Sequence, residues 1–184
     1  GTLTGTLSKP FFHGDVSSKS IMINGEELTD IQCKLDSDGG IKNHLLGSFK
    51  QAPKGVLSAE LDYNHEQKLL QGNIVAIYGN VRSILKMAKD DYNVDGLAQG
   101  EIAINPHGSG SGIFVDVWVD DISINDLKYE EMKFKGHLQD KVWYFDDVKL
   151  METKDVTDKG IVAVGGKVDL ANGKLELEAG AVDV

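Results

Sequence analysis

Apolar and polar residues alternate along most of this chain, and the alternation is clearest between Ile113 and Met151. Successive side chains of a β-strand point to opposite faces of its sheet, so a period of two predicts strands with one apolar and one polar face. Short connections at Asn125–Asp126, 136–140 and Asp146–Asp147 separate the predicted strands. Connections of this length leave no room for parallel crossovers, so the pattern predicts a mainly β, antiparallel protein.

Two further connections carry a specific turn signal. Asn24–Gly25 and Asn172–Gly173 each lie between alternating segments. Asn followed by Gly suits the two-residue type I′ turn, because both residues tolerate a positive φ. We therefore predict a tight hairpin at each of the two places.

One segment follows a helical period instead. Val81, Ile84, Leu85 and Ala88 fall at positions i, i+3, i+4 and i+7, which is the apolar stripe of an amphipathic helix. Asn80 is a suitable N-cap residue. The pattern predicts one short helix over about 80–91, packed by its apolar stripe against the sheet.

The chain also resembles itself. Residues 21–35 align with 122–135 when Ile23 is placed on Ile124, and 61–71 resembles 168–178. Repeats of this kind predict an extended array of strands. We therefore expect two similar, continuous units, 1–95 ending in the helix and 96–184.

Composition narrows the possible partners. The 184 residues carry a net charge of -10, which repels phosphate backbones, so we expect no nucleic-acid partner. Cys33 is the only cysteine, which rules out an internal disulfide, and we expect it to be a buried structural thiol. No apolar run approaches the roughly 18 residues of a membrane-spanning helix. Both termini fall inside strand-like segments, which we expect of a piece of a longer protein.

Catalytic and metal-binding motifs are not evident. The five histidines are scattered near predicted turns, without the spacing of a metal site. The glycine-rich segment 108–112 is followed by neither lysine nor a predicted helix, so it does not fit a phosphate loop, and Ser109 and Ser111 lack a nucleophile elbow. We expect no enzymatic activity, no metal and no cofactor, although carboxylates that meet only in space would escape this argument.

The predicted strands have more apolar surface than one short helix covers. A sheet with one apolar face must bury that face against another layer. The sheet therefore either folds into a sandwich or presents its apolar face to a protein or lipid partner.

Three segments resemble a known family: the runs from Leu127 to Met151 and from Gly160 to Val184, and the helical segment 81–91 followed by 96–105. They are similar to the repeating units of TamB and the wider AsmA-like envelope proteins. The resemblance implies a long, curved antiparallel sheet folded like a taco around an apolar groove. It also implies a periplasm-spanning parent anchored in the inner membrane, which carries phospholipid toward the outer membrane and acts with an Omp85-type barrel in outer-membrane protein assembly. The membrane helix and the barrel-docking segment of that family are not found in this sequence.

If acyl chains lie along such a groove, alternate strand residues line it. The alternation predicts these lining residues: Leu57, Leu61, Val115, Val117, Val119, Ile122, Ile124, Met132, Phe134, Trp143, Phe145, Val148, Leu150, Leu175 and Leu177. The alternative is a structural or adhesive β-sandwich or solenoid segment of a surface protein, with a closed core and no lipid path. A third hypothesis is that an open edge strand pairs with a client strand. Exposed edges also predict self-association.

Overall fold

The protein is a single antiparallel β-sheet, described in a computed structural model for residues 1–6, 9–87, 89, 92–106, 112–125, 127–155 and 158–183. The sheet contains thirteen strands, and each pairs antiparallel with its neighbour in sequence except that β8 pairs with both β9 and β10. The strands are β1 (Thr2–Thr6), β2 (Lys9–Ile23), β3 (Glu26–Asp38), β4 (Lys42–Gln51), β5 (Gly55–Asn64), β6 (Leu69–Asn80), β7 (Val94–Ile104), β8 (Gly112–Ile124), β9 (Leu127–Lys128), β10 (Glu131–Gln139), β11 (Val142–Asp155), β12 (Asp158–Asp169) and β13 (Lys174–Asp183).

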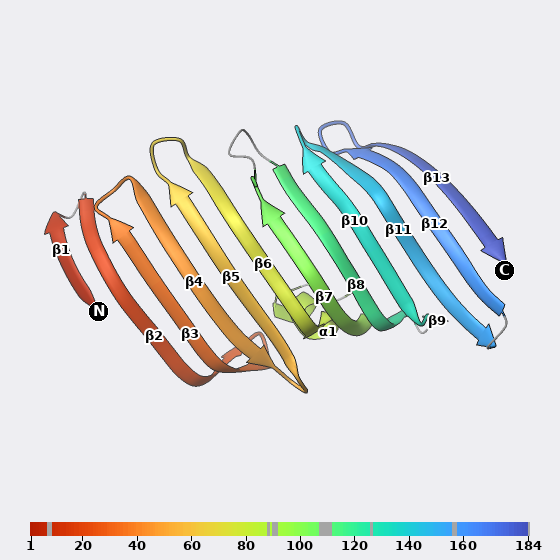
Figure 1. Cartoon of the computed structure of the whole chain (residues 1–184), viewed down its shortest axis with the longest axis horizontal. Helices are drawn as coiled ribbons and strands as arrows, with labels where there is room; N and C mark the ends of the chain where they lie inside the picture. Colours follow the sequence, from red (N-terminus) through yellow and green to blue (C-terminus); the bar gives the residue numbers. More distant parts are fainter. Residues whose placement is uncertain are drawn as a thin grey trace.

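The sheet is not closed. β1 and β13 lie at opposite ends of the sheet, as Figure 1 shows. No second sheet packs on it within the residues that the structure describes. The prediction of a mainly β protein with one long, curved antiparallel sheet and one short helix is therefore confirmed. The expected boundary at 95/96 falls inside β7, which pairs with β6 on one side and β8 on the other. The division into two similar units stays a prediction.

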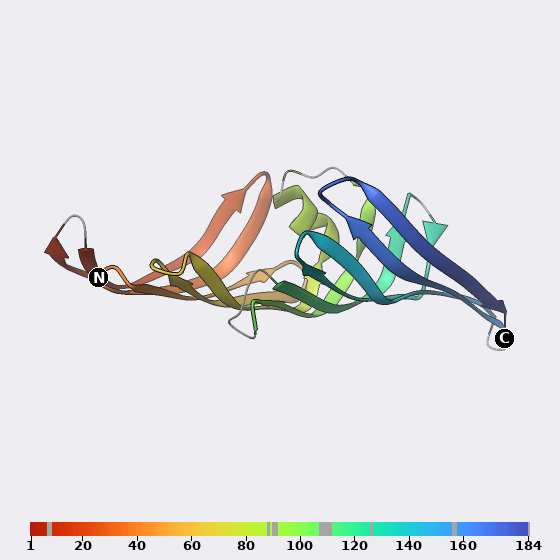
Figure 2. The ribbon, with the colours of Figure 1, turned by 90° about the horizontal axis from the view of Figure 1, so that it is seen from above.

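The strands bend out of the plane of the sheet at one end, as the view from above shows (Figure 2). β-Bulges lie near this end: the strand registers shift around Asp30, Tyr78, Gly96 and Asp121, all with a positive φ. An extra residue in one strand bends that strand and increases its twist. The bulges therefore fold one margin of the sheet over the face on which the helix lies.

The helix α1 (Val81–Met87) connects β6 to β7 and has seven residues, so it is shorter than the predicted 80–91. Asn80 caps it as expected: the Ser83 N–H donates to Asn80 Oδ1 at 2.9 Å. The helix ends where the Lys89 N–H donates to Lys86 O and Lys89 takes φ +60°. Ala88, Asp90 and Asp91 of the predicted helix lie outside the described residues.

Some predicted turns are wrong. Gly136 lies inside β10, whose turn to β11 is at Asp140–Lys141, and Asp146–Asp147 is a bulge inside β11. Polar residues that interrupt the alternation predict a break in each of these segments, but one extra residue inside a strand interrupts the alternation equally well.

The two Asn-Gly turns differ. Asn24 and Gly25 have φ +49° and +87°, which confirms the tight turn between β2 and β3. At the second site β12 and β13 last pair at Asp169 and Lys174, so the loop has four residues. Only Gly173 takes a positive φ there, and the two-residue type I′ prediction is wrong.

Candidate functional site

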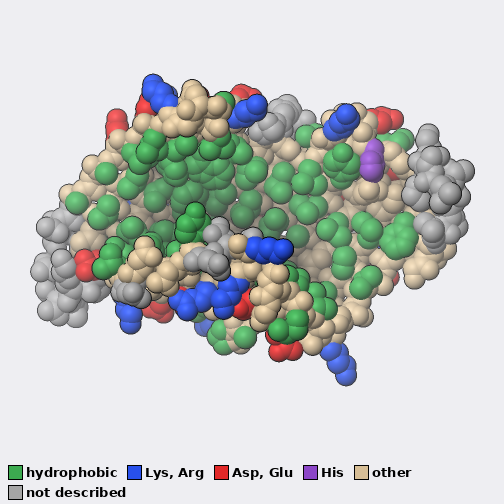
Figure 3. Space-filling view, turned by 180° about the vertical axis from the view of Figure 1, so that it is seen from behind, with side chains coloured by type: hydrophobic (Ala, Val, Ile, Leu, Met, Phe, Trp, Pro, Cys, Tyr) green, Lys and Arg blue, Asp and Glu red, His purple; other side chains and the backbone are tan. Residues whose placement is uncertain are grey.

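The inner face of the sheet, defined here as the face that carries α1, is a hollowed apolar surface. Val81 of the helix packs against a cluster of Ala98, Val119 and Ile122 from β7 and β8, which places the helix on this face. Figure 3 shows hydrophobic side chains gathered over the hollowed face, with charged side chains along its upper and lower margins. We call this surface the groove.

Strand pairing assigns the predicted lining residues to the groove. Residues paired across neighbouring strands point to the same face of the sheet. Val117 is paired with Phe134 and, through Gly100 and Ala76, with Leu57. Strand pairing connects the other predicted residues in the same manner. Ile122 is assigned to the inner face because it clusters with Val119, and Ile124 because it packs against that cluster. The structure places all fifteen predicted residues on the inner face, and their role in lipid binding stays a prediction.

Aromatic side chains fill the C-terminal half of the groove. The ring centroid of Phe134 lies 6.2 Å from those of both Trp143 and Phe145. The Phe145 ring stands nearly perpendicular to that of Phe134, at 89°, an arrangement that aromatic quadrupoles favour. The bulge at Asp146–Asp147 keeps both Phe145 and Val148 on the inner face, although three positions separate them.

Only a small part of the groove is fully buried. Among the described residues, the buried hydrophobic side chains are Leu28, Ala98, Val119 and Ile122. All four lie near the margin that bends toward α1. Other inner-face residues stay open: Leu175 and Leu177 on β13 are 57% and 49% exposed. The groove is therefore covered at one margin and accessible elsewhere.

The tip of the β2–β3 hairpin is bound to the helix. Ser83 Oγ donates to Glu26 Oε2 at 2.6 Å, and Lys86 Nζ lies 3.0 Å from Glu26 Oε1. Asn24 Nδ2 donates to the Met87 carbonyl at 2.9 Å, at the C-terminal end of α1. The hydrogen bond from Ser83, followed by that from Lys86, lowers the pKa of Glu26. We call these contacts the hairpin clamp, which joins segments about sixty residues apart and fixes the bent margin.

Gln51 is the buried polar residue of the same margin, and it is 3% exposed. Its Oε1 accepts a hydrogen bond from the Asn80 N–H at 2.7 Å, which ties the end of β4 to the start of α1. Its Nε2 has no partner among the described residues. Buried polar atoms normally have a hydrogen-bond partner. The bond from the Asn80 N–H to Oε1 is therefore the contact that holds the Gln51 side chain at this margin.

The outer face is mostly charged and hydrogen-bonded. Lys135 pairs with Asp116 at 3.3 Å, and Asp147 lies 3.0 Å from both Lys133 and Lys149. The hydrogen bond from Lys149, and then that from Lys133, lowers the pKa of Asp147. Exposed apolar side chains also lie on this face, namely Leu46, Ile77, Phe114 and Trp118. The alternation thus separates an apolar from a largely ionic face, as predicted.

The histidines do not form a metal site among the described residues. Three pair with outer-face carboxylates, namely His13 with Asp36, His44 with Asp62 and His137 with Asp146. His65 Nε2 and Asn43 Nδ2 are 2.8 Å apart. His107 and segment 108–111, with Ser109 and Ser111, lie outside the described residues.

Sequence patterns missed many inner-face residues in both halves of the groove. Register places Cys33 beside Gly47, and Gly47 beside Ala59, in one inner-face row. Cys33 was expected to be buried, but it is partly exposed, because the groove has no covering layer there. Other unpredicted inner-face residues are Leu28, Ile31, Leu35, Leu45, Phe49, Ile74, Ile102, Ile104, Ile113, Leu138, Val162, Val164 and Val168. The alternation marks most of them, but only strand pairing joins them into rows.

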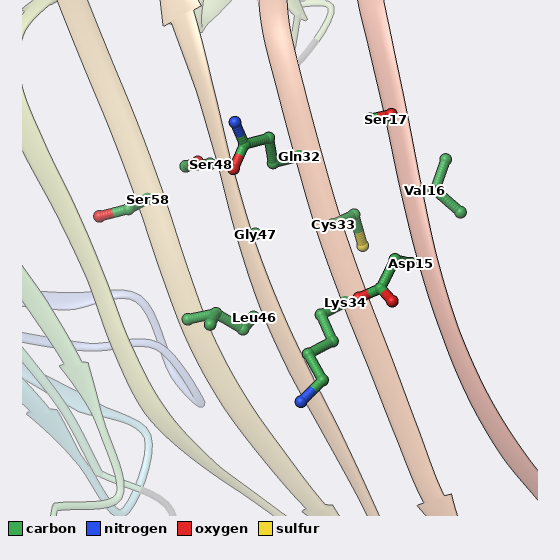
Figure 4. Close-up of a pocket in the computed structure, with 10 residues that line it drawn as sticks. All are labelled: Asp15, Val16, Ser17, Gln32, Cys33, Lys34, Leu46, Gly47, Ser48 and Ser58. Atoms are coloured by element: carbon green, nitrogen blue, oxygen red, sulfur yellow. The ribbon is translucent and has the colours of Figure 1, made fainter. Parts of the chain in front are cut away.

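The outer face of β2 to β5 carries a depression of about 480 Å³ (Figure 4). Its labelled side chains come from β2, β3, β4 and β5, and they include Asp15, Lys34, Gln32 and Ser48. Val16, Cys33 and Leu46 are labelled with them, so the lining of this depression mixes apolar with polar and charged side chains.

No family model, curated protein or solved structure matches this chain. The likeness to TamB and the AsmA-like proteins therefore rests on the sequence pattern. Within the described residues, no helix is both long and apolar enough to span a membrane.

Proposed function

We propose that the protein is a segment of a lipid conduit that holds phospholipid acyl chains in the groove. Acyl chains lie against the inner-face rows, and the polar head groups stay at the charged margins or in water. The role is passive binding and passage, without catalysis, metal or cofactor. Burying hydrocarbon against an apolar surface is favourable by about 25 cal/mol per Å² removed from water.

One observation carries this proposal: among the residues that the structure describes, nothing beyond α1 covers the apolar inner face. A chain of 184 residues whose described part buries only four hydrophobic side chains leaves a long apolar surface in contact with solvent. Monomeric soluble proteins rarely expose contiguous apolar patches of this extent, and those that do use them for binding. A closed sandwich core, as in the structural or adhesive alternative, requires a second layer that the described sheet does not have.

The wider role follows from the resemblance. We propose that the parent protein is anchored in the inner membrane, spans the periplasm and passes phospholipid between the inner and outer membranes. An Omp85-type barrel is its proposed partner in outer-membrane protein assembly. The open sheet supports this role because further units added at either edge would lengthen the same groove.

Strand pairing at an edge is a second candidate. β13 is an edge strand of ten residues, and Leu175 is 57% exposed on it. A long exposed edge offers unpaired backbone groups to another strand. A client strand or a second copy of this chain would bind there by extending the sheet.

Native mass spectrometry with lipid extraction tests the conduit. The purified chain should carry phospholipid, and Val117→Asp or Phe134→Asp should remove it while circular dichroism still reports a folded sheet. A charge on the inner face costs several kcal/mol when it must contact hydrocarbon. Trp118→Asp is the matched control. Trp118 follows Val117 in β8, but its side chain points to the outer face, so a charge there should leave the lipid bound.

The competing proposals give different results. If no lipid is bound and Val117→Asp simply unfolds the chain, the inner face is a closed core and the conduit is rejected. If a strand peptide crosslinks to β13 while lipid is absent, edge pairing is the better account.

A further inference from the structure

The groove contains a local depression in its N-terminal half, on the inner face of β3 to β6. It has a volume of about 310 Å³, and the inner-face side chains that line it are Ile31, Cys33, Phe49, Leu57, Ala59 and Ile74. Gln32, Ser48 and Ser58, which belong to an outer-face row, also border it. The main chain of Gly47 also lines it. We call it the Gly47 depression. None of its lining residues except Leu57 was predicted as a lipid contact.

Small side chains create the depression. Cys33, Gly47 and Ala59 are paired across three neighbouring strands, so a row of small residues runs between larger ones. Phe49 and Leu57, which are paired two positions along, form one wall. The missing volume at Gly47 therefore opens the surface between the bulky rows.

The backbone does not require glycine at position 47. A Cβ there would meet only Gln32 O, at 3.7 Å, which is an ordinary contact. Gly100 is different: it has φ +144°, and its Cβ would lie 2.2 Å from Asp116 O. Local geometry therefore accounts for Gly100 but not for Gly47, whose effect is to leave space on the inner face.

The corresponding row in the C-terminal half is filled. Gly136 belongs to this row through its pairing with Val115 and Phe145. A Cβ there would meet Tyr144 O at 2.5 Å, so the backbone requires glycine, and the Phe134 ring lies 3.5 Å from the same position. Large rings thus cover that glycine, whereas no ring covers Gly47. The Gly47 depression is a distinct site within the groove.

The chemistry of the lining selects the occupant. The inward side chains offer hydrocarbon and one thiol, and the backbones of β3 to β6 are paired to each other on both sides. A buried polar group without a hydrogen-bond partner costs about 1–3 kcal/mol or more, so a head group or a peptide backbone is disfavoured. A client strand also needs a free sheet edge, and these strands are interior to the sheet. An alkyl chain has no such requirement.

We propose that the Gly47 depression binds one acyl chain of a phospholipid and so is a discrete holding position within the conduit. This inference rests on the proposed function, because it names where in the groove a chain is held. Head groups remain outside the depression, since its inward-pointing side chains give them no polar partner.

Cys33 supplies the first test, because it is the only cysteine of the chain and lines the depression. After delipidation of the full chain, the rate at which a maleimide alkylates the Cys33 thiol would be measured. Vesicles of palmitoyl-oleoyl phosphatidylethanolamine and phosphatidylglycerol would then be added. At a lipid concentration about ten times the dissociation constant, occupancy should slow alkylation by about tenfold.

A phospholipid with a photoreactive group at the end of one acyl chain supplies the second test. In the wild-type chain, crosslinks should concentrate on residues 31–74, around the depression. Gly47→Leu fills the space and should remove these crosslinks while lipid elsewhere in the groove remains. Gly165→Leu is the matched control: Gly165 lies on the outer face of β12, where a Cβ meets only Phe145 O at 3.8 Å, and crosslinking should be unchanged.

The outcomes separate the two proposals. No bound phospholipid in the wild-type chain rejects the conduit and this site together. Bound phospholipid with unchanged Cys33 alkylation, or with crosslinks confined to the aromatic half, rejects the Gly47 depression alone. The Cys33 measurement on the wild-type chain decides the matter even if Gly47→Leu fails to fold, and Gly47→Ala provides a smaller filling change.

Discussion

The margin of the groove beneath α1 and the edge strand β13 carry similar alternation but differ sharply in burial. Val119 and Ile122 at the α1 margin are 3% and 1% exposed, whereas Leu175 and Leu177 on β13 are 57% and 49% exposed. Both pairs belong to the inner face. The α1 margin has the helix above it and strands on both sides, while within the described part of the chain β13 has neither a cover nor a second neighbouring strand.

The comparison separates two uses of the same pattern. Beneath α1, apolar residues stabilise the fold, because burial removes them from water on all sides. On β13 and along the open groove they contribute less to the stability of the isolated chain and remain available to a ligand. An alternating sequence therefore contains both a small core and a binding surface, and the covering helix divides them.

The largest expected effect is at the centre of the α1 margin. Ile122→Ala should destabilise the protein by about 2–5 kcal/mol, because it leaves a cavity in the buried cluster. Leu175→Ala on the open edge should change the free energy of unfolding by at most about 0.5 kcal/mol. Urea unfolding of both variants, followed by circular dichroism, measures the difference. Equal losses would mean that the two regions are buried alike.

A smaller effect is expected at Gln51. Gln51→Ala removes the acceptor of the Asn80 N–H and should destabilise the protein by about 1–3 kcal/mol. The matched control is Gln32→Ala, on the exposed outer face of β3, which should cost at most about 0.5 kcal/mol. Unfolding midpoints in urea report both. A Gln51 variant as stable as the control would show that the bond to α1 is dispensable.

The smallest effect is the pH dependence of the hairpin clamp. The pKa of Glu26 is lowered from 4.5 by its bonds to Ser83 and Lys86, so its carboxylate stabilises the folded state at pH values above 4.5. This stabilisation is lost as the pH falls through the lowered pKa. Glu26→Gln should therefore be less stable than wild type at pH 7, and the difference should shrink toward pH 3. Thermal unfolding across this range measures it, and a difference independent of pH would contradict the assignment.

Much of the fold could be predicted because its signals are local. Alternation around Val115, Val117 and Val119 identified the faces, and the Asn24–Gly25 turn and the Asn80 cap depend on residues close in sequence. The fifteen predicted lining residues lie on the inner face for the same reason. Bulges were a source of error, since the extra residue at Asp146–Asp147 looks like a turn when the partner strand is unknown.

The sequence by itself determined which side chains share a face, where the tight β2–β3 turn lies and where the helix begins, because each depends on φ, ψ and side chains within a few residues. Only the tertiary structure decided which apolar residues are buried. The bond from Gln51 to Asn80, the hairpin clamp from Glu26 to Ser83 and the space at Gly47 all join segments that are distant along the chain. Burial depends on what other strands and the helix place above a residue, and alternation carries no information about that.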